Sequence, residues 1–183
     1  LVYITGASSG IGQALALHYA RAGWHLALVV RKKNETKSWL DAQQVRSECY
    51  QIYESDVTDT PALVAAGRAA IAAQGVPDVV IANAGISVGI DTADRGDLDI
   101  MALTFATNNV GMAATFHPFV QPMVERGRGT LVGVASVAGW RGMPGNGAYC
   151  ASKAGLIAYL QSLRAELRPT PLTVHTISPG YLR

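Results

Sequence analysis

Tyr149 and Lys153 are spaced so that they could move a proton together. They lie four residues apart in a stretch whose pattern predicts a helix, which places both side chains on one face with Cβ atoms about 5–6 Å apart. An ammonium beside a phenol favours the phenolate, and such a pair can exchange a proton with a carbonyl or an alcohol. Alone, this spacing is more typical of a core tyrosine beside a solvated lysine, so the interpretation depends on what accompanies it.

Ser136 is a third candidate for this chemistry. It follows the apolar run 131–135, which predicts a strand. Parallel sheets bind ligands at the carboxyl ends of their strands, so the hydroxyl could orient a substrate oxygen. The plainer alternative is an ordinary loop hydroxyl.

A glycine-rich segment near the N-terminus could bind a phosphate. Thr5-Gly6-Ala7-Ser8-Ser9-Gly10-Ile11-Gly12 joins an apolar run that predicts a strand to a pattern that predicts a helix. Glycines let backbone N–H groups approach a pyrophosphate closely, and the helix N-terminus adds a partial positive charge. The spacing is GxxxGxG and no GK[ST] follows, so a P-loop is not indicated. A glycine-rich turn without a ligand is the alternative.

Arg31 bears on which dinucleotide would bind. A fold that prefers NAD carries an acidic residue at the end of its second strand, but here Val30 is followed by Arg31, Lys32 and Lys33. A guanidinium at this place would pair with a 2′-phosphate, which favours NADP over NAD. The alternative is a solvated basic turn.

Strands and helices alternate along the chain, which indicates right-handed crossovers and a parallel sheet. The pattern predicts an α/β fold: a three-layer, doubly wound (Rossmann) parallel sheet in a single domain. Pro118 and Pro122 should kink or end the longest helix. The predicted strands are 1–4, 26–30, 50–53, 79–82, 131–135 and 172–177, and the predicted helices are 11–22, 61–74, 98–126 and 148–167, with a short surface helix within 31–44.

Composition excludes several classes of protein. The chain has 183 residues, 49% of them hydrophobic and 15% charged, which fits one domain with a substantial core and excludes a disordered protein. A net charge of +2 is too small for a nucleic-acid binder. The uncharged stretch 101–124 contains polar residues and prolines that are costly in lipid, so we expect no membrane association. Two cysteines without metal-ligand spacing, and no signal peptide, favour the cytoplasm. His18, His25, His117 and His175 show no ligand spacing, so no metal is expected.

Taken together, these motifs make the chain resemble the short-chain dehydrogenase/reductase family over essentially its whole length. The segment 5–12 is similar to the family's TGxxxGIG cofactor motif, and Ser136, Tyr149 and Lys153 match its Ser and YxxxK with the same 13-residue step. Ala82-Asn83-Ala84-Gly85 is similar to the family's NNAG, with Ala82 in place of the first asparagine. The resemblance implies that 1–183 is an NAD(P)-binding domain with an integral catalytic site, and that a substrate lid would follow residue 183.

The resemblance also suggests a role for further residues. An asparagine in the long helix completes the family's catalytic tetrad; Asn108 and Asn109 are both candidates, and Asn108 precedes Gly111 with the family's NxxG spacing on a stripe of apolar residues. We choose Asn108, with a structural amide as the alternative. The implied cofactor contacts are Gly6, Ser8, Ser9, Gly10, Ile11, Gly12, Arg31, Asp56, Val57, Asn83, Ala84, Gly85, Tyr149, Lys153, Pro179 and Gly180. Asp56 could equally be a turn carboxylate, and Pro179 and Gly180 ordinary turn residues.

These features predict an NADP(H)-dependent oxidoreductase that interconverts a carbonyl and a secondary alcohol on a small or medium apolar substrate. Ser136 would hold the substrate oxygen, Tyr149 would exchange the proton, Lys153 would favour the phenolate and hold the nicotinamide ribose, and Asn108 would anchor a proton relay. One alternative is an NADP(H)-binding sensor or scaffold without turnover; another is an epimerase or dehydratase, which would carry a larger substrate domain. The family resemblance favours a homodimer or homotetramer. Small residues on the helix 148–167 would allow close approach of the sheet or of a second subunit.

Overall fold

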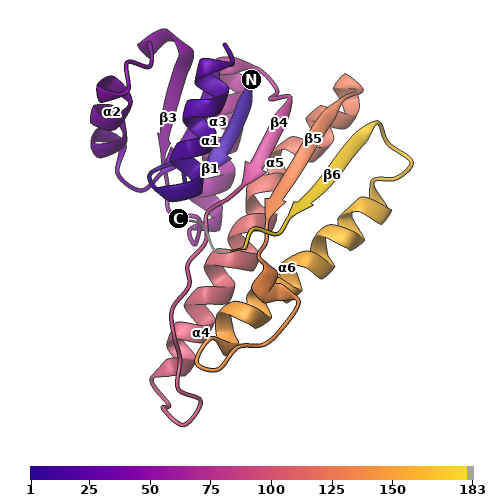
Figure 1. The fold of residues 1–183 in the computed structure, drawn as a ribbon. Coiled ribbons are helices and arrows are strands. Elements are labelled where there is room, and N and C mark those ends of the chain that lie inside the picture. The colour runs from indigo at the N-terminus through magenta and orange to yellow at the C-terminus, as the bar shows by residue number, and fades with distance from the viewer. Residues whose placement is uncertain (181–183) are drawn as a thin grey trace.

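The structure, a computed structural model, describes residues 1–180, so Arg183, where the sequence stops, lies outside the described residues. Six parallel strands form one sheet in the order β3-β2-β1-β4-β5-β6 (Figure 1). The strands are β1 (Val2–Thr5), β2 (Leu26–Val30), β3 (Tyr50–Glu54), β4 (Val79–Ala82), β5 (Gly129–Val134) and β6 (Leu172–Ile177). The predicted doubly wound α/β fold is confirmed, and its strand order reverses between β1 and β4, where such folds bind ligands.

The strands are connected mainly through helices. These are α1 (Gly10–Arg21), α2 (Lys33–Ala42), α3 (Thr60–Gln74), α4 (Asp97–Phe105), α5 (Gly111–Arg126) and α6 (Gly147–Glu166). Three short elements complete the fold: the 3₁₀ turns η1 (Ser47–Cys49) and η3 (Val137–Gly139), and the π-helical turn η2 (Ala106–Val110) between α4 and α5. No helix among residues 1–180 combines the length and apolarity that a membrane crossing needs.

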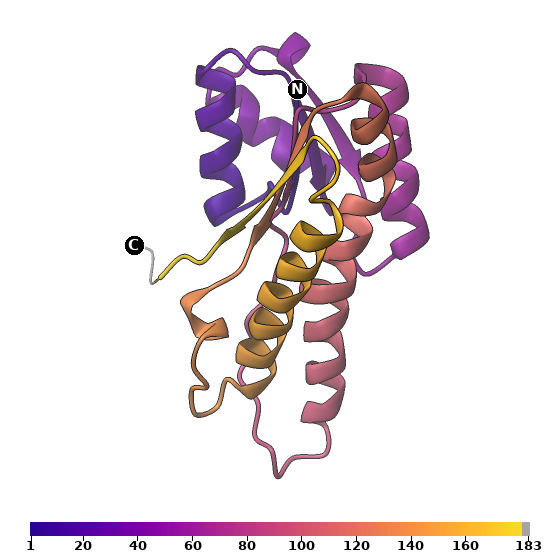
Figure 2. The same ribbon diagram turned by 90° about the vertical axis from the view of Figure 1, so that its right-hand side faces the viewer.

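The alternation of side chains along β1 separates two hydrophobic clusters, one on each face of the sheet. Val2 and Ile4 belong to the cluster that includes residues of α1 and α2. Tyr3 belongs to the cluster under α3, α5 and α6. Both faces of a central strand are therefore buried, which explains why its sequence is continuously apolar. Figures 1 and 2 show the two helical layers on opposite sides of the sheet.

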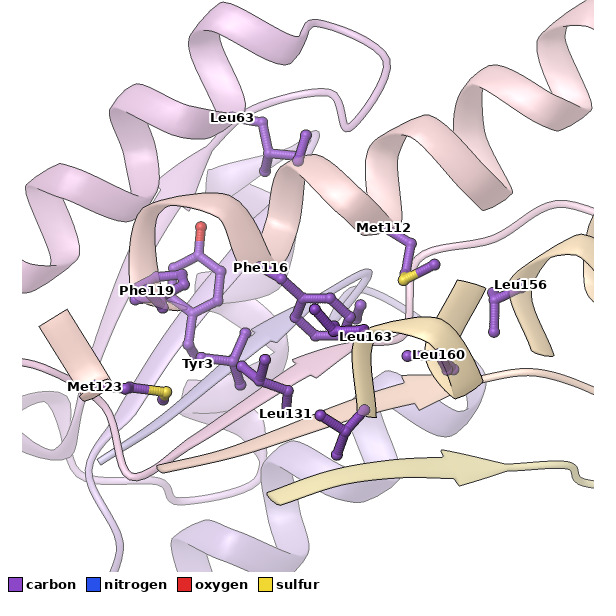
Figure 3. Close-up of a cluster of buried hydrophobic side chains, with 14 of the residues drawn as sticks. Tyr3, Leu63, Met112, Phe116, Phe119, Met123, Leu131, Leu156, Leu160 and Leu163 are labelled. Atoms are coloured by element: carbon purple, nitrogen blue, oxygen red, sulfur yellow. The ribbon is translucent and has the colours of Figure 1, made fainter. Parts of the chain in front are cut away.

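The larger cluster holds α5 and α6 against the sheet (Figure 3). The ring of Tyr3 packs against Phe119 of α5 at a centroid distance of 4.6 Å. Leu131 of β5 and Leu160 of α6 are also fully buried. The first half of α6, which carries the candidate tyrosine and lysine, is therefore part of a rigidly packed helix.

The long helix differs from the sequence prediction in two ways. Pro118 and Pro122 were expected to kink or end the helix; they do not end it, because both lie inside α5, which continues to Arg126. Pro118 is buried against α3: a Cβ built on Gly67 would lie 2.4 Å from its Cγ, and this packing offsets the lost helical hydrogen bond. The predicted apolar stripe is buried from Met112 onward, whereas Leu98 is 60% exposed.

Within residues 1–180, one face of the sheet edge at β6 is exposed. In β6, Leu172 and Val174 point into the core below α6, and the intervening Thr173 and His175 are exposed on the other face. The helical layer formed by α1 and α2 packs against β1, β2 and β3. The three-layer architecture is therefore complete over these strands, and within residues 1–180 β6 has helices on one face only.

Candidate active site

A cavity of about 330 Å³ opens where β1, β2, β3 and β4 end. It collects most of the predicted cofactor contacts from four separate loops. Those lining it are Gly6, Ser8, Ser9, Gly10, Ile11, Arg31, Asp56, Val57, Asn83, Ala84 and Gly85. Residues that the sequence reasoning missed also line it: Val29, Val30, Ser55, Thr58, Ile86, Leu103 and Thr107. The last two come from the long helix, whose path toward the cavity depends on tertiary packing.

The glycine loop is shaped by two close backbone approaches. Gly6 has φ +68°, and a Cβ there would lie 2.7 Å from the Cα of Ala84. Gly12 does not line the cavity; a Cβ on it would lie 2.1 Å from the oxygen of Gly6. Asn83 locks the arrangement, because its Nδ2 donates to the carbonyl oxygens of Thr5 (3.1 Å) and Gly6 (3.2 Å). Only glycine fits at positions 6 and 12.

This cradle fits the diphosphate of a dinucleotide. Ser9, the N-cap of α1, makes no side-chain capping bond, and the first turn of α1 has no acidic residue. The free N–H groups and the partial positive charge at the N-terminus of α1 lie at the cavity, and both favour the binding of an anion there. The bare backbone around Gly6 and Gly10 leaves room for phosphate oxygens.

Arg31 and Asp56 lie on the same cavity at the ends of β2 and β3. Lys32 pairs with Glu35 at 2.7 Å, whereas Arg31 makes no ion pair with the described residues. Thr58 donates its N–H (2.9 Å) and its hydroxyl (2.7 Å) to Asp56 Oδ1. These bonds, with a smaller contribution from Arg31, hold the pKa of Asp56 below its usual value. Asp56 is thus both a turn carboxylate and a lining residue.

A second cavity, of about 460 Å³, holds the candidate proton-transfer group. Ser136 follows β5 and Tyr149 lies in the first turn of α6, and both line it. The Oγ of Ser136 accepts a hydrogen bond from the N–H of Ala138 (3.1 Å), which fixes the serine at the start of η3. Its hydroxyl proton stays available to a ligand. Gly180 lines this cavity too, and the carbonyl of Pro179 accepts from the N–H of Val137 (3.0 Å).

Lys153 lies one helical turn after Tyr149, as the spacing predicts. Its Nζ is 5.8 Å from the centre of the Tyr149 ring and donates to the carbonyl of Val134 at 2.8 Å. Only 4% of the residue is exposed. This burial lowers the pKa of Lys153 to about 8. The ammonium is therefore held beside the tyrosine with few competing partners.

Asn108 is completely buried in the π-helical turn η2. Its Oδ1 accepts from the N–H of Ile86 (2.8 Å), and its Nδ2 donates to the carbonyl of Ile86 (2.9 Å) and to Ser152 Oγ (2.9 Å). The neighbouring Asn109 donates to the carbonyl of Ser152 at 2.8 Å. Both asparagines thus bind the same residue of α6, because the wider π turn brings consecutive side chains to one side.

Gly85 brings the first cavity close to Asn108 and Lys153. A Cβ built on this glycine would lie 3.1 Å from Asn108 Oδ1 and 3.4 Å from Lys153 Nζ. Gly85 itself lines the first cavity, so these two polar groups lie at its border. Ser136 and Tyr149 line the second cavity, and Asn108 and Lys153 lie beside Gly85 at the border of the first.

Sequence reasoning missed Ser152 and much of the second cavity. Ser152 Oγ donates to the carbonyl of Tyr149 (2.8 Å) while accepting from Asn108. A small polar residue beside Lys153 on the buried side of the helix was the available signal. The missed lining residues are Ser87, Val137, Ala138, Arg141, Met143 and Asn146. Among residues 1–180, no group of three or more His, Cys, Asp or Glu could hold a metal ion.

Comparison with known proteins gives consistent matches. The family model described as short chain dehydrogenase matches residues 1–183. An uncharacterized oxidoreductase of Myxococcus xanthus (strain DK1622) is 41% identical over 180 residues, covering 98% of this chain and 71% of that protein. Among other curated relatives, the chain spans from 57% to 72% of their length.

Solved structures share the fold and include both nicotinamide cofactors. A short-chain dehydrogenase/reductase from Burkholderia phymatum in complex with NAD has 26% identity and a TM-score of 0.89, over 99% of this chain and 66% of that one. The closed form of a serine dehydrogenase complexed with NADP+ has 24% identity and a TM-score of 0.90, over 98% and 72% of the two chains. The latter likeness bears on the fold alone.

Proposed function

Because this chain belongs to the short-chain dehydrogenase family of oxidoreductases, we propose that it interconverts a carbonyl and a secondary alcohol on a small or medium substrate, with NADP(H) as cofactor. The observation that carries the proposal is the position of Ser136 and Tyr149 on one cavity, with Lys153 beside Tyr149 and close to Gly85 of the first cavity. A substrate oxygen could contact both hydroxyls from that cavity.

The first cleft would hold the dinucleotide. Its diphosphate would lie on the glycine loop 6–12, its adenine near Asp56 and Val57, and its nicotinamide between Gly85 and the segment of Pro179 and Gly180. Arg31, which makes no ion pair with the described residues, supports a 2′-phosphate and therefore NADP over NAD. When bound, the nicotinamide supplies or accepts the hydride.

The side chains of this protein would handle the proton and the orientation of the substrate. Ser136 Oγ would donate to the substrate oxygen, and the hydroxyl of Tyr149 would give it a proton during reduction or take one during oxidation. Lys153 would favour the phenolate and bind the nicotinamide ribose. Asn108 would anchor the relay that returns a proton to this pair, in addition to the three hydrogen bonds it makes to Ile86 and Ser152.

We also propose that the protein assembles into a homodimer or homotetramer. Leu156, Ile157, Leu160 and Leu163 of α6 are buried toward the sheet, so they leave the small residues of this helix on its outer face. Ala151, Ala154, Gly155, Ala158 and Ser162 are exposed there, and the exposed apolar Leu98, Val110 and Tyr159 lie on the long helix and α6. This exposure supports a second subunit, rather than the sheet, as the partner. The free thiols Cys49 and Cys150 support a cytoplasmic location.

An isotope-transfer experiment tests the proposed reaction. The purified protein is incubated with a panel of ketones and NADPH or NADH carrying two deuterium atoms at nicotinamide C4. We expect one deuterium on the carbinol carbon of a product alcohol for each cofactor oxidised, with faster transfer from NADPH. A protein that quenches or shifts NADPH fluorescence on binding, but transfers no deuterium to any ketone, would instead be a sensor or scaffold.

A further inference from the structure

Among the residues that the structure describes, one permanent charge lines the second cavity. Arg141 contributes a guanidinium to its lining, and no aspartate or glutamate of the described residues lines it. The whole segment that builds most of this cavity lacks acidic residues, because none occurs between Glu125 and Glu166. The cavity is therefore electropositive close to Ser136 and Tyr149.

Arg141 is exposed and, like Arg31, lacks among the described residues the carboxylate partner that three other arginines have. Arg46 pairs with Glu48, and Arg126 and Arg128 both pair with Asp78. Among residues 1–180, Arg141 has no carboxylate within ion-pair distance. A guanidinium offers several N–H donors in a planar fork that matches a carboxylate, and a ligand that enters the cavity would complete that pairing.

We infer that Arg141 determines specificity by binding a carboxylate of the substrate, so that the preferred substrates are short hydroxy acids and oxo acids. The inference rests on the proposed function. Ser136 and Tyr149 would hold the reacting oxygen, and Val137, Ala138 and Met143 would contact the carbon chain between the two polar ends. A cavity of about 460 Å³ has room for a molecule of this kind. This anionic end departs from the apolar substrate that the sequence analysis predicts.

A matched pair of substrates tests this assignment. Oxidation of 3-hydroxybutyrate and of its uncharged methyl ester by NADP+ is followed as reduced-nicotinamide absorbance. We expect kcat/KM for the acid to exceed that for the ester by about 10- to 100-fold, the range of a charge-assisted hydrogen bond. Arg141→Gln should abolish this ratio. Arg168→Gln, which removes an exposed arginine just beyond the opposite end of α6, should preserve it.

Binding provides a second readout that does not depend on turnover. Trp140 adjoins Arg141 and is 68% exposed, so tryptophan fluorescence reports on this position. Titration with butyrate should give a saturable change in the wild type and in Arg168→Gln, and none in Arg141→Gln. The carboxylate assignment would be overturned if the acid-to-ester ratio of kcat/KM were equal in wild type and Arg141→Gln, or if butyrate binding survived Arg141→Gln. It would also be overturned if methylphosphonate bound more tightly than butyrate in an Arg141-dependent way. Saturable butyrate binding with no oxidation of any alcohol would contradict the proposed function alone.

Discussion

Lys153 combines a positive charge with nearly complete burial, and this combination makes the stability of the fold depend on pH. Burial lowers its pKa from 10.5 in the unfolded chain to about 8 in the folded protein. Below pH 8 the lysine is protonated in both states, so the folded state bears the full cost of the buried charge. Between pH 8 and 10.5 the unfolded chain binds more protons, so this cost falls as the pH rises.

We therefore expect the free energy of unfolding of the wild type, relative to Lys153→Met, to increase from pH 7.5 to pH 10 by about 1–3 kcal/mol. Urea denaturation of both proteins across that range measures the difference. Subtracting the unfolding free energy of Lys153→Met at each pH removes the contribution of the other groups that titrate in this range. Parallel curves for the two proteins would mean that Lys153 is not perturbed by burial.

Ser152 links Asn108 to the first turn of α6 through two hydrogen bonds. Ser152→Ala would leave one N–H of a fully buried amide without a partner, which costs about 1–3 kcal/mol. We expect the free energy of unfolding to fall by this amount and kcat to fall more than KM rises, because Tyr149 loses its fixed position. Ser152→Thr keeps the hydroxyl and should restore both. An alanine variant with wild-type kcat would exclude a positioning role.

Sequence spacing sufficed for some site residues and not for others. Tyr149 and Lys153 share one helix, so local periodicity was enough to place them on one face of it. That Ser136 belongs with them was expected from the family resemblance. Arg141 and Ser87 enter the second cavity from loops whose paths depend on packing between distant segments. The local sequence pattern does not indicate the path of such a loop.

At the scale of elements, the glycine loop depends on an approach between two backbones that no side chain allows. A Cβ on Gly12 would lie 2.1 Å from the carbonyl oxygen of Gly6, so Gly12→Ala must displace the loop from the start of α1. We expect the dissociation constant of NADPH, measured by fluorescence titration, to rise at least about tenfold because the phosphate site is distorted.

The matched control is Gly23→Ala, just after the other end of α1. Gly23 has φ +80°, and a Cβ added there would meet no atom within 4 Å. The change should cost about 1–2 kcal/mol of stability through backbone strain and leave NADPH affinity intact. Equal affinities in the Gly12 and Gly23 variants would disprove the role assigned to the cradle.

The elements themselves were largely predictable. The bounds of β2, β4 and β6 agree with the sequence patterns, because buried parallel strands are short apolar runs between turn residues. The long helix was harder to predict from the sequence, because its interior prolines and its π turn depend on contacts with α3 and α6. Pro118 persists because it packs on Gly67 of α3, a contact between segments so far apart in the sequence that no local pattern could reveal it.

At the scale of the whole molecule, the outer face of α6 is expected to bind a second subunit. Ala158→Arg would place a long charged side chain on that face and should convert the proposed dimer or tetramer into a smaller species in sedimentation velocity. Ala72→Arg, on the exposed side of α3, is the control and should leave the mass unchanged. A monomeric wild type, or an unchanged mass in the α6 variant, would count against this interface.

The central claim is that the phenol of Tyr149 exchanges the proton next to a bound nicotinamide. The most direct measurement compares Tyr149→Phe with the wild type for NADPH affinity, by fluorescence titration, and for ketone reduction, by nicotinamide absorbance. We predict NADPH affinity within about threefold of the wild type and a loss of kcat of at least about a hundredfold, as expected when a general acid is removed. Turnover at the wild-type rate in this variant would contradict the proton-transfer role of Tyr149.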